Sequence, residues 1–214
     1  MKDFFIELGS KIEEAVIEDF RHIRSQIGNE KIYAIVLATD GDCITLNLWV
    51  NTYEHLEKKD TEYGYHDKEA YINEHQNRLT SEEIDKIRND EDYLTLKWVP
   101  DEYGYSYDGA SGTVEISKLL FDKSKALYDE IDLLEKSEQE QKSEEMQTEF
   151  CELFLETTTA SFLNLIQGNA FALDPEEVTY FIHMTDDDRT DIIAKESAKA
   201  LNCKKVYEEF LKNI

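Results

Sequence analysis

Cysteines and long apolar runs are scarce in this sequence. Its three cysteines, Cys43, Cys151 and Cys203, are odd in number and far apart, which fits neither a disulfide framework nor a CxxC metal site. No apolar run approaches the roughly 20 residues that span a bilayer. The start, MKDFFIELGSKIEEAV, carries acids where a signal peptide needs an unbroken apolar region. We therefore expect a cytoplasmic protein with no membrane partner.

Basic residues are also few. The chain has 23 lysines and arginines against 48 aspartates and glutamates, a formal net charge of −25. Such a surface repels nucleic acid and attracts cationic proteins. Nucleic-acid binding needs a basic stripe, which this sequence lacks, so we predict no nucleic-acid partner. The acids are densest in residues 129–156, which contain eleven acidic residues and two lysines and so have a net charge of −9.

Common catalytic signatures are missing as well. The sequence contains no GxSxG, P-loop or GxGxxG motif, and its five histidines show no HxxxH or HExxH spacing. We expect no cofactor and no bound metal. Sites built from carboxylates carry no short pattern, so an enzyme of that kind remains an open alternative.

What is present is enough apolar residue for a core. Hydrophobic residues make up 41% of the 214, and one domain over residues 1–214 is the expected organisation. Apolar residues at three- or four-residue spacing predict a helix over residues 4–27. Residues 31–39 and 43–51 predict an antiparallel hairpin joined by Asp40-Gly41-Asp42. The nearly continuous apolar character of both strands predicts that they lie inside a sheet covered on both faces.

The rest of the chain adds helices and two strands. We predict strands at 93–98 and 178–184. One helix should begin near Ser81, and another should follow a cap at Thr185 or Asp186. Three more are expected over residues 116–134, 146–161 and 204–211. The polar, acidic segment around 135–145 is either a loop or an exposed helix. The fold class is α+β, with one largely antiparallel sheet of about four or more strands and helices packed on it; mixed α/β is the alternative.

Two segments are candidates for a site. Asp40 and Asp42 flank a glycine at a hairpin tip, where turn chemistry alone explains them. In the alternative interpretation they join Asp101 and Glu102 in a catalytic or metal-binding carboxylate site. The second segment, WVPDEYGYSY, includes Trp98, and its tyrosines, Tyr103, Tyr105 and Tyr107, have the composition of a binding surface. In the alternative interpretation these aromatic side chains pack against the end of the core.

Several motifs resemble one bacterial family. The turn Thr39-Asp40-Gly41-Asp42 resembles the family's turn at the end of its first strand, and Asn51-Thr52-Tyr53-Glu54 resembles the start of the helix after its second strand. Further on, LKWVPDEYGY resembles its tryptophan-proline segment and LNCKKVYEEF its ending. The family is domain of unknown function 4303. Tyr103 stands where the family usually has tryptophan, and Cys203 and Lys204 replace prolines. The family has no established activity, although some members look like immunity or accessory proteins of bacterial toxin systems. The resemblance implies that this chain could have a role of that kind.

These observations lead to three hypotheses. The first is a non-catalytic, cytoplasmic, immunity-like protein that neutralises a cationic partner such as a toxin domain. The second is a carboxylate- or metal-dependent hydrolase, and the third is a structural accessory protein without a small-molecule site. For the first hypothesis, the expected binding residues are Trp98, Asp101, Glu102, Tyr103 and Tyr105, with Asp40 and Asp42.

Overall fold

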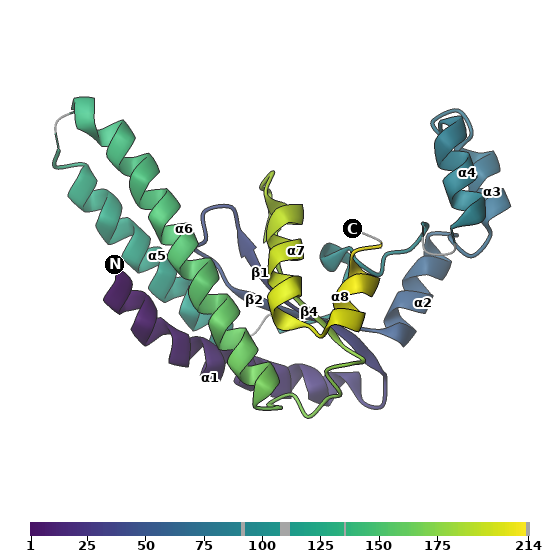
Figure 1. The fold of residues 1–214 in the computed structure, drawn as a ribbon, viewed down its shortest axis with the longest axis horizontal. Coiled ribbons are helices and arrows are strands. Elements are labelled where there is room, and N and C mark those ends of the chain that lie inside the picture. Colours follow the sequence, from purple (N-terminus) through teal and green to yellow (C-terminus); the bar gives the residue numbers. More distant parts are fainter. Residues whose placement is uncertain (91–92, 108–111, 135, 213–214) are drawn as a thin grey trace.

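A four-stranded sheet with helices on both faces forms the centre of the molecule (Figure 1). The computed structural model describes the chain except residues 91–92, 108–111, 135 and 213–214, and only the backbone of 137–138. In the sheet, β1 (Ile32–Asp40) and β2 (Asn47–Thr52) are followed in the sequence by β3 (Tyr105–Ser106) and β4 (Thr179–Thr185). None of the described helices combines the length and apolar character needed to cross a membrane.

The strand order is β3-β2-β1-β4. The pairs β1–β2 and β2–β3 are antiparallel, and β1–β4 is parallel. The predicted hairpin is therefore confirmed, with a longer connection over residues 41–46, and so is the α+β fold class. The predicted strand at 178–184 is present as β4.

Strand β1 is buried on both faces. Its first eight residues, 32–39, are all buried. Because side chains alternate along a strand, Ile35 and Leu37 point into one apolar cluster and Val36 into another. This confirms that the hairpin occupies the interior of the sheet.

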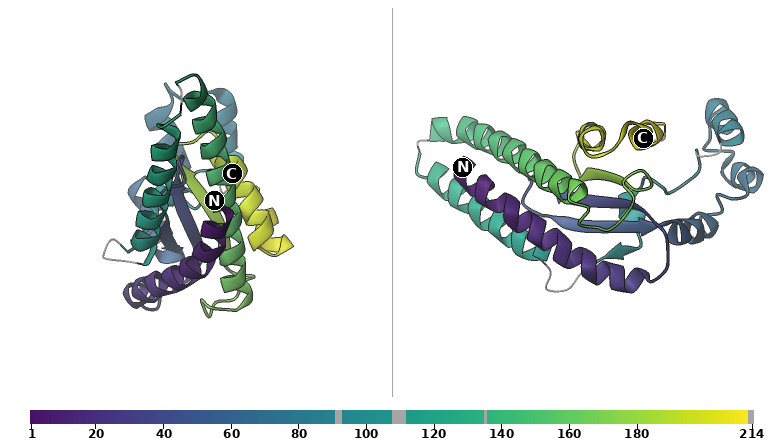
Figure 2. Two further views of the ribbon diagram at one scale, coloured as in Figure 1. Left: turned by 90° about the vertical axis from the view of Figure 1, so that its left-hand side faces the viewer. Right: turned by 60° about the horizontal axis from the view of Figure 1, so that its bottom comes forward.

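One face is covered by α1 (Lys2–Ile27), α5 (Gly112–Ile131) and α6 (Lys136–Gln167). Figure 2 shows α1 and α6 across the sheet from α7 (Thr190–Leu201) and α8 (Lys204–Phe210). The apolar stripe of α1 was readable as a helix because its buried residues recur every three or four positions. The described part of the acidic segment, 136–145, is the start of α6 rather than a loop.

A buried carboxylate joins α1 to α5. Asp19, only 1% exposed, accepts hydrogen bonds from the backbone nitrogens of Gly112 (2.8 Å) and Thr113 (3.0 Å) and from the Thr113 hydroxyl (2.6 Å). It thus satisfies donors at the start of α5 and places a negative charge at the positive end of that helix. A Cβ on Gly112 would lie 2.5 Å from the Cα of Ala15, so the close approach requires glycine.

The other face is covered by α7, α8 and the segment around Trp98, which packs against Phe181 and Phe210. Helix α2 (Tyr53–Glu62) continues directly from β2. Two further helices, α3 (Lys68–His75) and α4 (Ser81–Asn89), project from the body (Figure 1). The predicted start of α4 is confirmed by a capping box.

Two predictions were wrong. Residues 93–98 form no strand, because the Asp60 carboxylate accepts from the Leu96 nitrogen and the Thr95 hydroxyl (both 2.9 Å). A side chain satisfies groups that a strand partner would otherwise satisfy, and β3 takes the sheet edge instead. Helix α7 is not capped by Thr185 or Asp186 but begins at Thr190.

We expect Leu37→Asp to unfold the protein, because an unpaired buried charge costs about 3–5 kcal/mol, a large part of a typical domain's stability. Leu133→Asp is the matched control, since Leu133 is 87% exposed while Leu37 is fully buried. Urea denaturation followed by circular dichroism measures both. Equal midpoints for the two variants would show that β1 is not the buried strand.

We expect Asp19→Asn to lower the free energy of unfolding by about 2 kcal/mol, because hydrogen bonds to a charged acceptor contribute about 1.5–3 kcal/mol. The neighbouring exposed residue supplies the control, Glu18→Gln, which should change stability little. Denaturation midpoints decide this as well. A loss no larger than that of the control would mean that the carboxylate does not hold α5 to α1.

Candidate functional site

The turn after β1 is organised by its own hydrogen bonds. An oxygen of the Asp40 carboxylate accepts from the Ile44 nitrogen (3.0 Å), and the Asp40 carbonyl accepts from the Cys43 nitrogen (3.0 Å). The Asp40 nitrogen donates to the Thr45 hydroxyl (3.0 Å). Asp42 is exposed, and its carbonyl accepts from the Gln147 side chain (2.8 Å). These contacts favour the interpretation of Asp40 and Asp42 as turn residues.

The four candidate carboxylates do not form one cluster. Glu102 pairs with Lys59 (3.1 Å) and accepts from the Tyr63 hydroxyl (3.0 Å), and these contacts, with Lys59 the stronger, lower the pKa of its carboxyl. Burial lowers the pKa of His183 in β4, and the negative charge of Asp101 partly opposes this lowering. Across the described residues, no three histidines, cysteines, aspartates or glutamates are placed to hold a metal ion. The geometry therefore gives the hydrolase hypothesis no support.

The predicted aromatic segment is largely turned inward. Trp98 is only 9% exposed and lies edge-on to Tyr33. The hydroxyls of Tyr33 and Tyr103 both donate to the Lys97 carbonyl, at 2.9 and 3.0 Å. Burial raises the pKa of Tyr103 well above its ordinary value. These contacts favour the packing interpretation for Trp98 and Tyr103.

The next residues attach the segment to the helices beside it. Tyr105 donates to the Glu30 carboxylate (2.7 Å), and partial burial together with this bond raises the pKa of Tyr105 to about 12. A Cβ on Gly104 would lie 2.5 Å from the Nδ1 atom of His55, so glycine is required where the chain passes α2. A partner would have to break these contacts to use the aromatic side chains, which makes this segment a poor binding surface.

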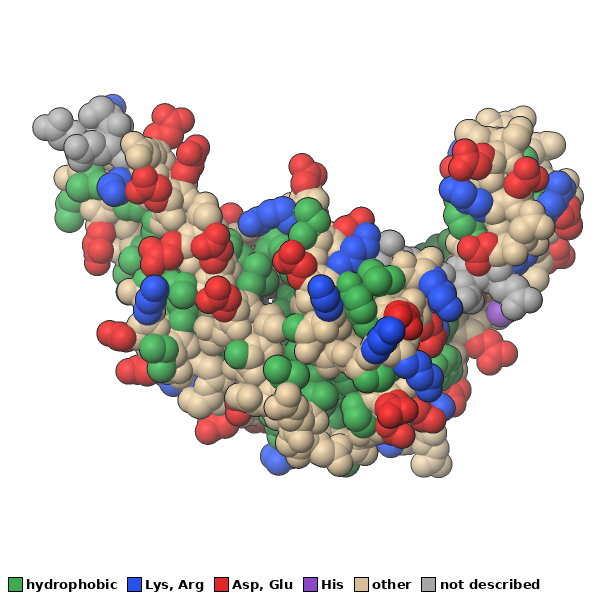
Figure 3. Space-filling view, viewed as in Figure 1, with side chains coloured by type: hydrophobic (Ala, Val, Ile, Leu, Met, Phe, Trp, Pro, Cys, Tyr) green, Lys and Arg blue, Asp and Glu red, His purple; other side chains and the backbone are tan. Residues whose placement is uncertain are grey.

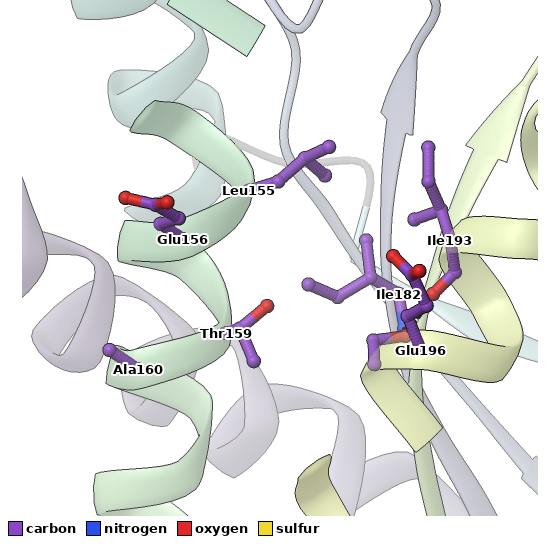
Figure 4. A pocket seen from close by; sticks show the side chains of 8 residues that line it. Leu155, Glu156, Thr159, Ala160, Ile182, Ile193 and Glu196 are labelled. Atoms are coloured by element: carbon purple, nitrogen blue, oxygen red, sulfur yellow. Dashed lines mark hydrogen bonds between the residues drawn. The ribbon is translucent and has the colours of Figure 1, made fainter. Parts of the chain in front are cut away.

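One alternative is a groove of about 430 Å³ between α6 and α7. Figure 4 shows Leu155 and Thr159 projecting from α6 toward Ile182 of β4 and Ile193 of α7. Glu156 points away from this space in the same view. The groove is mainly apolar, with Glu196 of α7 as a further lining residue, and two lining glutamates do not explain the acidity of the chain.

A second cavity has a volume of about 490 Å³. It lies on a part of the molecule that we call the arm, which consists of residues 121–134, at the end of α5 and just after it, and residues 136–149, in the first half of α6. The arm extends beyond the sheet (Figure 1). Apolar side chains from three segments line the cavity: Met1, Leu127, Ile131, Leu134 and Met146. Three glutamates and one lysine complete the lining: Glu130, Glu145, Glu149 and Lys142. We call this cavity the arm site.

The charge around the arm site is negative. Lys142 pairs with Glu145 (3.1 Å), and the pKa of Glu145 is lowered by a hydrogen bond from Gln141 and by Lys142. Glu130 and Glu149 form no ion pair with any described residue. Figure 3 shows acidic side chains along α5 and α6. The arm site therefore presents two carboxylates that are free to meet a cation.

Apolar side chains are also exposed on the arm. Leu133 is 87% exposed and Phe121 55%, and Tyr128 and Leu134 are exposed to a smaller degree. The Tyr128 hydroxyl donates to the Gln147 side chain (3.1 Å) and so links α5 to α6. Sequence reasoning found the acids of this region but assigned its leucines to a helix stripe. The pair Leu133-Leu134 could have indicated this surface. It lies among acidic residues at an exposed helix end, where leucine is not needed for packing.

Comparison with protein families agrees with the motifs described above. The model of a domain of unknown function, DUF4303, matches residues 12–203. The match covers the turn at Asp40, the tryptophan segment and the whole arm. Comparisons with curated proteins and with solved structures give no significant match.

We expect EDTA to leave the melting temperature unchanged, because Glu102 is engaged with Lys59 and Tyr63, and no three potential metal ligands among the described residues lie together. Differential scanning calorimetry with and without the chelator tests this. A drop of several degrees that is reversed by one added metal would contradict the prediction.

Proposed function

The chain belongs to the family of domain of unknown function 4303, and we propose that it is a non-catalytic, immunity-like protein of the bacterial cytoplasm that binds and neutralises a cationic protein such as a toxin domain. The observation that carries this proposal is the arm site, an apolar cavity rimmed by glutamates in the most acidic part of the chain. The partner segment would present an apolar side chain flanked by lysines or arginines.

Charge and apolar contact have different roles in such a complex. At physiological salt the field of exposed charges decays over about 8 Å, so the net charge of −9 over residues 129–156 speeds encounter but does not hold the partner. Affinity has to come from a desolvated apolar contact. The arm supplies both within one surface, since Leu127 and Leu134 line the same cavity as Glu130 and Glu149.

The position of the arm also supports this role. The arm site lies beyond the sheet, so occupying it requires no opening of the core. By contrast, the aromatic segment at Trp98 closes one face of the sheet. A cavity that is open at the surface of the arm can bind a partner without the cost of local unfolding.

Charge neutralisation on the arm should slow association. We expect Glu130→Gln with Glu149→Gln to reduce the association rate for a leucine-lysine helical peptide several-fold and to weaken its salt dependence, with the dissociation rate little changed. The matched control is Glu74→Gln with Glu82→Gln on α3 and α4, which removes the same charge elsewhere. Surface plasmon resonance at several salt concentrations measures both. Equal effects of the two pairs would show that only net charge matters.

Loss of an apolar contact should instead speed dissociation. We expect Leu134→Ala to raise the dissociation rate of the same peptide, by an amount equivalent to about 1–2 kcal/mol. Leu211→Ala is the control, because Leu211 is exposed to a similar degree (39% against 37%) but follows α8 and lies outside the arm. An unchanged dissociation rate in a folded Leu134→Ala variant would remove the arm site as the anchor.

A further inference from the structure

Two of the three cysteines, far apart in the sequence, meet in the fold. Cys43 lies in the connection between β1 and β2, and Cys151 lies on α6; both are buried. The Cys151 thiol contacts the Gly41 carbonyl (3.8 Å) and, through the Gln147 amide (3.4 Å), is linked to the same turn. Cys43 and Cys151 belong to the same buried cluster, and the interaction between their side chains shifts the pKa of both thiols. The structure thus brings together two cysteines that no sequence motif connects.

The backbone holds this contact in place. Cys43 has a positive φ of 59°, a conformation that side-chain-bearing residues adopt rarely. The Gln147 amide donates to the Asp42 carbonyl (2.8 Å) as well as to Cys151, so one side chain of α6 fastens both the turn and the thiol. The turn is at the surface, where Asp42 is exposed.

The surroundings of the pair make the two thiols unequal. Hydrogen bonding from Cys43, and then the positive charge of Arg189, lower the pKa of Cys151. Hydrogen bonding to Cys151 and burial raise the pKa of Cys43. Arg189 itself is held by Asp187 (2.8 Å) at the start of α7. Cys151 thus has more thiolate character, and the thiolate is the form that reacts with oxidants.

We propose that Cys43 and Cys151 are an oxidative modification site, in which hydrogen peroxide produces a reversible disulfide that fastens the β1–β2 connection to α6. This inference is independent of the proposed binding function. It requires the two Cα atoms to lie within about 4.4–6.8 Å when bonded, and the Cys151 thiol already lies 3.8 Å from the carbonyl of Gly41, two residues before Cys43.

The chemistry takes two balanced steps. The Cys151 thiolate attacks one oxygen of hydrogen peroxide, the O–O bond breaks, and a sulfenic acid and hydroxide are formed. The sulfur of Cys43 then displaces hydroxide from the sulfenic acid, so that an S–S bond replaces the S–O bond and one water is released with the Cys43 proton. Peroxide is the oxidant in this scheme, and a dithiol reductant reverses the product.

Cys203, which is exposed, provides a matched background. The folded Cys203→Ser protein is treated with peroxide, alkylated after unfolding, digested without reductant and analysed by mass spectrometry. We expect a single peptide pair that links Cys43 to Cys151 and is lighter by two hydrogen atoms than the two reduced peptides. The melting temperature of the same sample should rise by several degrees and return to its original value with dithiothreitol.

Further variants decide whether the pairing is specific. In Cys203→Ser backgrounds, Cys43→Ser and Cys151→Ser should each abolish the cross-link, and neither oxidised variant should gain thermal stability. Full alkylation of both cysteines after peroxide treatment of the Cys203→Ser protein would overturn the proposal. Oxidation of Cys151 to sulfinic acid without a cross-link would overturn it too, because Cys43 would then not be placed to resolve the sulfenic acid.

Discussion

Burial of β1 on both faces is the constraint on which the rest of the structure depends. Eight consecutive residues, 32–39, are buried, so each face of the sheet needs a layer of side chains over it. A strand of this kind cannot remain at an edge or face water, because its apolar surface on either side would stay exposed. The long helices α1, α5 and α6 cover one face. The second face has a more varied cover.

The layer that covers the second face of the sheet explains why the aromatic segment has a structural role. Helices α7 and α8 are short, and Trp98 fills the space among Tyr33, Phe181 and Phe210. The carbonyl of Lys97, which accepts from two tyrosine hydroxyls, fixes the backbone next to it. Residues with the composition of an interface are thus used to complete a core. The arm lies beyond the sheet, and its charge and exposed leucines have no such structural explanation.

Two of the acidic residues have a structural role that the surface acids do not have. Most of the 48 acids are solvated, but Asp19 is buried and bonded to the start of α5, and Asp60 holds the irregular segment before Trp98. Each of these carboxylates replaces backbone partners that regular secondary structure would supply. Sequence inspection cannot distinguish them from neighbouring surface acids, since burial is decided by elements distant in the chain.

The sequence by itself determined the elements whose signals are local. Apolar spacing specified α1, turn chemistry specified the β1–β2 hairpin, and Thr80 with Glu83 specified the start of α4. The strand predicted at 93–98 failed because Asp60, more than thirty positions away, satisfies its backbone. Only the tertiary structure decided that β4 pairs in parallel with β1, that the arm encloses a cavity, and that Cys43 meets Cys151. Contacts between residues so far apart leave no periodic or neighbouring pattern, because they are fixed by how helices and strands pack.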